Sequence, residues 1–275
     1  MGDNGRIYVA EDTVPAYRGL LRDADLILPN QFEAELLSEV KIQDLESLVQ
    51  AIGKLHGVHR VPHVLITSVQ LPPTRASTPQ PGQEESRLNA KLSVIGSTAT
   101  SDMKPRLFRI TVPTLPVFFS GTGDMLAATL VARLRQAAQR AGVLAKPSWL
   151  SDDDVTAPEL PLAKATEKAL ASMHAILKDT TEHYQAKVSR WDAEIKLQEG
   201  SGEEAEHKRE TQRHLMLTRW AEVRVVRNAR ALREPPDLQD FQAEAVDVMS
   251  GAAPDPEPDE LGVLKPREGG AVHQE

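Results

Sequence analysis

Hydrophobic and polar positions in the first half of the chain divide it into short apolar runs and longer segments with helical spacing. Apolar runs predict strands at 6–9, 25–28, 64–67, 91–95 and 107–112. Apolar residues three or four positions apart predict helices at 14–22, 31–38, 42–56 and 122–139. Short buried strands that alternate with helices are typical of an α/β fold built in layers.

Polar segments separate and follow these elements. Three polar insertions are predicted, at about 71–90, 146–161 and 185–213. The last of them is expected to form an exposed helix that is interrupted at 200–202. Residues 247–275 are rich in proline and acidic side chains, and we expect them to be a disordered tail. The sequence thus predicts one domain over residues 1–246.

The composition excludes several kinds of functional site. The chain of 275 residues has no cysteine, which excludes a disulfide scaffold, a thiolate zinc site and a cysteine nucleophile. Its eight histidines lack metal-ligand spacing, so they are expected to be surface or core residues. The net charge of −8 provides no global attraction for nucleic acid. A bound anion would therefore be held locally, by backbone dipoles or by metal ions.

No signal peptide is visible at the N-terminus, and no stretch approaches the roughly 18 apolar residues of a membrane span. We therefore expect a cytoplasmic protein that does not bind membranes, with the nucleus left open as a second location.

The strongest motif is Ser120-Gly121-Thr122-Gly123-Asp124, which stands directly before a predicted helix. Glycines let the backbone approach a ligand closely, and the free N–H groups at a helix start attract anions. A carboxylate in the first turn, Asp124, can accept a proton from an attacking hydroxyl. The arrangement suits phosphoryl transfer to an alcohol, although it is not a Walker A loop because no Lys-Ser/Thr follows. The alternative is a plain helix cap, with Thr122 capping and Asp124 complementing the dipole.

Two further groups of polar residues follow predicted strands. Asn30 and Glu33 come after the strand at 25–28, and their oxygens suit a hydrated Mg²⁺ beside phosphates. Their spacing equally fits a capping box. Thr67 and Ser68 end another strand, where hydroxyls can bind phosphate or ribose or can simply begin a turn.

The order and spacing of these motifs resemble pyridoxal kinases of the ribokinase-like superfamily. The segments that carry the resemblance are 8–12, 25–37 (with the string PNQFEAELL), 65–68 and 121–124. Downstream, 172–177 and 222–226 are similar to that family's C-terminal helix and strand. The resemblance implies a three-layer α/β fold, with a ribokinase-like sheet and flanking helices.

The chain departs from the family pattern near its start. The family's Asp-Pro-Val-x-Gly-Asp motif is represented only by Met1-Gly2-Asp3, and the family segment that precedes this motif is absent. We therefore expect an N-terminally truncated domain that keeps the ATP-binding portion, and expect residues 1–275 alone to fold poorly and to lack activity. Residue 28 is Leu where relatives often have Thr, which weakens the implication of a K⁺ or Na⁺ site there.

The resemblance also implies roles for individual residues. Asp124 would be the base that activates the 5′-hydroxymethyl group of pyridoxal, and Gly121, Thr122 and Gly123 would form the anion hole. The residues implied to bind ATP are Asp3, Tyr8, Asn30, Thr67, Ser68, Leu115 and Val117. Glu33 would bind the Mg²⁺ ion, through phosphates or water. The implied cofactors are ATP and Mg²⁺, and the implied substrates are pyridoxal, pyridoxine and pyridoxamine. The complete enzyme would be a homodimer.

Two alternatives stay open from the sequence. One is a hydroxymethylpyrimidine kinase, a related enzyme of the same superfamily. The other is an inactive fragment that binds nucleotide or pairs with a full-length partner.

Overall fold

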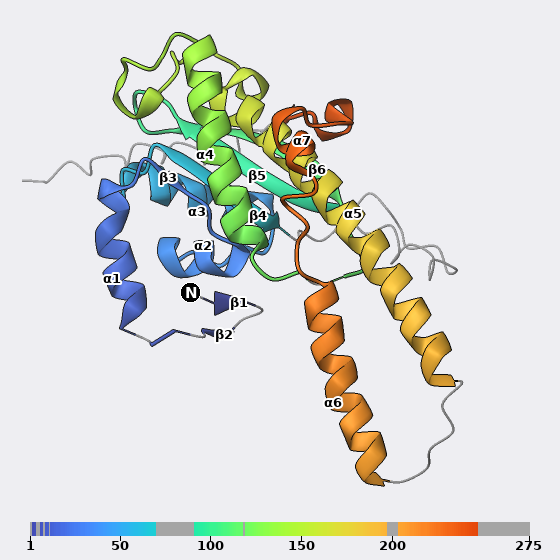
Figure 1. Ribbon diagram of the computed structural model, residues 1–275. Helices are drawn as coiled ribbons and strands as arrows, with labels where there is room; N and C mark the ends of the chain where they lie inside the picture. Colours follow the sequence, from blue (N-terminus) through green and yellow to red (C-terminus); the bar gives the residue numbers. More distant parts are fainter. Residues whose placement is uncertain are drawn as a thin grey trace, which may run out of the picture.

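The computed structural model describes residues 2–3, 6–7, 9–10, 12–69, 91–117, 119–196 and 203–246. Five strands form one mixed sheet in the order β3-β4-β5-β6-β7 (Figure 1). Their bounds are Leu26–Ile27, His63–Val69, Lys91–Ala99, Pro105–Pro113 and Glu244–Ala245. Near the start of the chain, β1 (Gly2–Asp3) and β2 (Arg6–Ile7) form a separate antiparallel pair.

Seven α-helices lie within the described residues. They are α1 (Thr13–Leu20), α2 (Gln31–Ser38), α3 (Leu45–Gly57), α4 (Thr122–Arg140), α5 (Pro161–Lys196), α6 (Glu203–Trp220) and α7 (Ala229–Arg233). In the part of the chain that is described, none of them combines the length and the apolar character needed to span a bilayer.

The sheet is covered on both faces because successive residues of its central strands point to opposite sides. Leu65 of β4 packs into one cluster with Leu130 of α4 and Leu162 of α5. Its neighbours in β4, Val64 and Ile66, pack into a second cluster with residues of α2 and α3. The expected layers of helix, sheet and helix are therefore present in the described residues (Figure 1).

The strands of this sheet pair in both directions. Among the described strands only β3 and β4 pair in parallel, while the β4·β5, β5·β6 and β6·β7 pairs are antiparallel. The longest ladder joins β5 and β6 from Lys91↔Pro113 to Ala99↔Pro105. Both strands are consequently longer than their apolar cores at 91–95 and 107–112 indicated.

The segment at 146–161 belongs to the folded body. It contains short 3₁₀ turns at Pro147–Trp149 and Ala157–Glu159. Arg106 at the start of β6 donates to the carbonyl oxygens of Asp152 (2.6 Å), Val155 (3.3 Å) and Ala99 (3.1 Å). One guanidinium thus joins this polar insertion to the sheet.

The C-terminal half of the described chain corrects one expectation. Residues 222–226 form turns and not a strand. Arg224 holds this segment against α5, because its guanidinium pairs with Asp179 at 3.0 Å and its backbone N–H donates to the Thr180 hydroxyl at 3.2 Å. Contacts between side chains and a helix take the place of strand pairing here.

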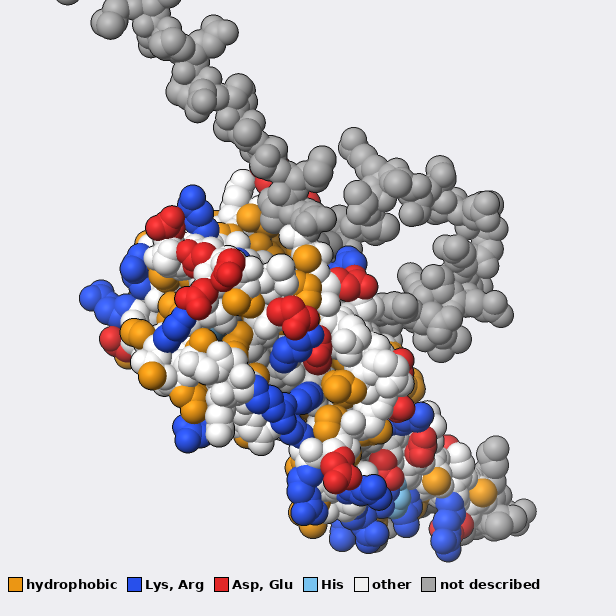
Figure 2. All heavy atoms as spheres, turned by 90° about the horizontal axis from the view of Figure 1, so that it is seen from above, with side chains coloured by type: hydrophobic (Ala, Val, Ile, Leu, Met, Phe, Trp, Pro, Cys, Tyr) orange, Lys and Arg blue, Asp and Glu red, His pale blue; other side chains and the backbone are white. Residues whose placement is uncertain are grey.

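Helices α5 and α6 extend together beyond the sheet (Figure 1), with Trp191 and Trp220 in edge-to-face contact at 5.9 Å. The expected helix over 185–213 is thus found as the end of α5 and most of α6. The expected interruption at 200–202, the insertion at 71–90 and the tail at 247–275 all lie outside the described residues. On the face that Figure 2 displays, acidic and basic side chains are interspersed, and hydrophobic ones are scattered between them.

Candidate functional site

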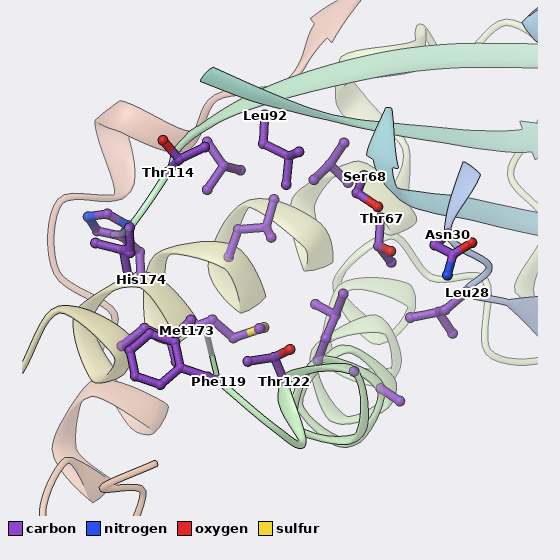
Figure 3. A pocket seen from close by; sticks show the side chains of 18 of the residues that line it. Leu28, Asn30, Thr67, Ser68, Leu92, Thr114, Phe119, Thr122, Met173 and His174 are labelled. Atoms are coloured by element: carbon purple, nitrogen blue, oxygen red, sulfur yellow. The ribbon is translucent and has the colours of Figure 1, made fainter. Parts of the chain in front are cut away.

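A cavity of about 770 Å³ lies between one end of the sheet and the helices α4 and α5. The close-up view shows side chains from β-strands, the start of α4 and the middle of α5 converging on it (Figure 3). Most of the residues predicted from the sequence line this cavity: Asn30, Glu33, Thr67, Ser68, Leu115, Val117, Thr122, Gly123 and Asp124. Four separate segments of the chain are thereby brought together.

The remaining candidates do not line the cavity as described. Gly121 precedes Thr122 at the cavity and shapes the turn there. The backbone of Asp3 belongs to β1, but its side chain lies outside the described residues, as does the whole of Tyr8.

The glycine turn before α4 has the geometry of an anion-binding helix start. Gly121 is the N-cap residue and adopts the left-handed conformation (φ 81°, ψ 7°), which favours glycine. No described side chain caps this helix, so the alternative in which Thr122 caps it is wrong. Thr122 is instead the first helical residue and is half-buried beside the cavity. The first N–H groups of α4 have no partners within the helix and are available to an anion.

Asp124 lies in the first turn of α4, as the sequence predicted. It is exposed and lines the cavity next to the helix start. A carboxylate in this position complements the helix dipole, and it can also accept a proton from a group bound in the cavity. Both interpretations of Asp124 are therefore compatible with its position.

Asn30 and Glu33 form the capping box of α2. The Asn30 Oδ1 atom accepts from the Glu33 N–H at 2.8 Å, and Glu33 Oε2 accepts from the Asn30 N–H at 3.0 Å. The capping interpretation is thus confirmed, and it also fixes both side chains at the edge of the cavity. Within the described ranges, no three His, Asp or Glu residues gather as a metal-binding group. The oxygens of Asn30 and Glu33 fit Mg²⁺ best where phosphate or water completes its coordination.

Thr67 and Ser68 lie within β4 and do not begin a turn. The register between β4 and β5 shifts between Ile66 and Val69, so regular pairing with β5 is interrupted at these two residues. The Thr67 N–H donates instead to the carbonyl of Pro29 at 3.0 Å, which joins β4 to the chain just before Asn30. This irregularity places both hydroxyl residues at the cavity.

Sequence reasoning missed much of the apolar wall and two polar residues. The missed residues are Leu92, Val94, Val112, Thr114, Phe119, Leu126, Met173, His174 and Leu177. His174 was expected to be a surface or core residue, but it is half-buried at the cavity. Its presence in the segment 172–177, which resembles a known C-terminal helix, was the one available signal. Leu28 also lines the cavity, and its side chain offers no oxygen to a monovalent cation.

Comparison with known proteins relates this chain to a group of kinases. Residues 2–144 match the family described as phosphomethylpyrimidine kinase. A Schizosaccharomyces pombe relative is 33% identical over 186 residues, which cover 68% of this chain and 52% of that protein. The pyridoxal kinase of Arabidopsis thaliana is 29% identical over 186 residues, covering 67% of this chain and 48% of the relative. The chain thus spans about half the length of the curated relatives it matches.

A solved structure agrees with this assignment. The pyridoxal kinase from Leishmania donovani in complex with ADP and pyridoxamine superposes with a TM-score of 0.56 at 26% sequence identity. The match covers 90% of this chain and 60% of the Leishmania chain.

Proposed function

This chain belongs to the pyridoxal kinase family of ribokinase-like proteins, and we propose that it serves ATP-dependent phosphorylation of the 5′-hydroxymethyl group of pyridoxal, pyridoxine or pyridoxamine. The single observation that carries the proposal is the meeting of the Gly121–Asp124 helix start with Asn30, Glu33 and Thr67 at one cavity. A proton acceptor, an anion-binding backbone and oxygen ligands are the parts that phosphoryl transfer requires.

The residues of this chain would act as follows. The substrate hydroxyl oxygen forms a bond to the γ-phosphorus, and the bond from that phosphorus to the bridging oxygen of ADP breaks. Asp124 accepts the hydroxyl proton as the new bond forms. The N–H groups at the start of α4 stabilise the charge on the transferring group, since they point toward the turn at Gly121.

Asn30 and Glu33 would hold Mg²⁺ together with phosphate oxygens, and their mutual capping bonds keep them in place. When bound, this ion supplies neutralisation of the phosphate charge. Thr67 and Ser68 would donate hydrogen bonds to the phosphates. A K⁺ or Na⁺ ion rests on the sequence resemblance alone.

The test is a turnover assay with purified protein, Mg²⁺-ATP and each of the three vitamers. Although the sequence alone suggested that residues 1–275 lack activity, the predicted site residues meet at one cavity. We therefore expect ADP and the 5′-phosphorylated vitamer to form in equal amounts, and we expect Asp124→Asn to remove both. ATP hydrolysis without a phosphorylated vitamer, or equal activity in the variant, would contradict the proposal.

A second candidate is a kinase for a hydroxymethylpyrimidine, because the matching family is described by a phosphomethylpyrimidine substrate. Adding that alcohol to the same assay separates the two substrates. A third outcome is nucleotide binding without transfer, which a calorimetric ATP titration detects independently of turnover. It is kept as an outcome because the described chain matches only about half of its relatives' length.

A further inference from the structure

The cavity has two polar ends of different chemistry. Figure 3 shows Asn30, Thr67 and Ser68 at one end, and Thr114 and His174 at the other. The wall between them is apolar and includes Leu92, Phe119 and Met173. The parts of a nucleotide follow in the same order. The charged phosphates match one polar end, the apolar faces of the flat base match the wall, and the polar edge of the base matches the other end. The cavity therefore suits a nucleotide that lies along it, with the base at the His174 end.

The imidazole of His174 packs against a buried aromatic ring. Its ring centroid lies 5.4 Å from that of Phe241, with an angle of 51° between the planes. Phe241 is only 2% exposed and belongs to the main core cluster, so it forms a firm support. The half-buried ring lines this cavity, and it also lines a smaller one of about 340 Å³ beside Phe241.

The surroundings of His174 favour a neutral imidazole. Burial lowers its pKa below the ordinary value of 6.5, and the nearby charge of Lys178 lowers it further. The carboxylates of Asp237 and Asp240 act in the opposite direction but do not reverse the shift. A neutral imidazole presents one N–H donor and one acceptor nitrogen. The edge of a nucleobase carries both kinds of group as well, so the two are complementary.

We propose that His174 binds the polar edge of the nucleotide base and thereby positions the base relative to the phosphates. This inference rests on the proposed function, because it requires a nucleotide in this cavity. The role proposed for His174 differs from that of the residues at the phosphate end. His174 contributes to the binding of ATP, and it contributes nothing to the binding of a polyphosphate that has no base.

Calorimetric titration of ATP and of inorganic tripolyphosphate, each with Mg²⁺, tests this difference. The proteins are wild type, His174→Ala and His174→Gln, with His183→Ala as the control. His183 lies on the same helix but does not line the cavity. We expect His174→Ala to weaken ATP binding by about 2- to 12-fold, the equivalent of one neutral hydrogen bond. Tripolyphosphate binding should stay unchanged, and Gln should recover part of the ATP affinity because its amide has a donor and an acceptor.

The other possible results of these titrations would each contradict the inference. Unchanged ATP affinity in both His174 variants overturns the inference and leaves the proposed function standing. Equal weakening of ATP and tripolyphosphate also overturns it, because a general structural effect then explains the loss. Wild-type protein that binds neither ligand overturns the inference and the proposed function together. Should His174→Ala fail to fold, the comparison of the two ligands in His174→Gln decides the matter.

Discussion

The ring of Phe108 lies directly over Gly96 across the β5–β6 pair. The two residues are partners in the antiparallel register, and a Cβ atom on Gly96 would lie 2.1 Å from Phe108 Cζ. Phe108 is fully buried in the cluster that α4 and α5 cover, so its ring has no open space into which it could swing. Glycine is needed at position 96 because of this close approach.

We expect Gly96→Ala to lower the free energy of unfolding by roughly 1–3 kcal/mol, the usual cost of overpacking a core. In a Phe108→Leu background the same substitution should cost clearly less, because the atom in conflict has been removed. Urea unfolding of the four proteins of this double-mutant cycle measures the coupling. Additive effects would show that the two side chains do not compete for one space.

Acid should destabilise the fold through His56. This side chain is fully buried, its Nδ1–H donates to the Val61 carbonyl at 2.6 Å, and Nε2 accepts from the Ser97 hydroxyl at 2.8 Å. Burial lowers its pKa from 6.5 to about 4, so the folded state resists a proton that the unfolded chain accepts. Stability is therefore fully present above pH 6.5 and falls as the pH decreases toward 4. The loss amounts to roughly 3 kcal/mol at the lower end.

Urea unfolding between pH 7 and pH 4 checks this in wild type and in His56→Gln. The pH dependence should be smaller in the variant by about the stated amount, whatever its absolute stability. His214→Gln, at an exposed position on α6, serves as the control and should keep the wild-type dependence. Parallel stability curves for all three proteins would show that His56 takes up no proton on unfolding.

Features that depend on neighbours in sequence could be predicted from the chain alone. The capping box of Asn30 and Glu33 spans three residues, and the helix start at Gly121 is marked by its own glycines. The direction of the strands and the position of His174 at the cavity depend on contacts between distant segments. His174 is 60 residues from Thr114 in sequence, yet both line one cavity, and local spacing carries no information about that meeting.

In the segment at 222–226, the local sequence predicts an element that the structure does not contain. Its valines are typical of a strand. However, β-propensity reflects how well a side chain packs within a sheet, and it does not by itself make a segment form a strand. In the structure Arg224 pairs with Asp179 of α5, a contact with a remote helix that the local sequence does not indicate.

Asp124→Asn should abolish phosphoryl transfer while ATP still binds. The amide keeps the size of the side chain but cannot accept the hydroxyl proton, and loss of a general base costs about 10²- to 10⁴-fold in rate. Initial rates and ATP titrations of wild type, Asp124→Asn and the exposed control Asp102→Asn provide the comparison. Near-normal turnover in Asp124→Asn would reduce Asp124 to a partner of the helix dipole.

Glu33→Gln separates the metal role of Glu33 from its capping role. Glutamine at the third helical position can still accept from the Asn30 N–H, so the capping box survives the change. The negative charge that would attract Mg²⁺ to the phosphates is lost. We expect the melting temperature to change little and the Mg²⁺-dependent gain in ATP affinity to fall by about 10- to 100-fold.

The matched control for this change is Glu46→Gln. Glu46 also lies in the first turn of a helix, α3, but it does not line the cavity. ATP titrations with Mg²⁺ and with EDTA, together with thermal melts, give the affinities and the stability of each protein. An equal Mg²⁺ response in wild type and Glu33→Gln would confine Glu33 to capping α2. A large drop in melting temperature would show that glutamine had not preserved the cap. In that case Glu33→Asp, which keeps the charge and shortens the reach, is the variant that decides between the two roles: the Mg²⁺ response persists if the charge binds the ion.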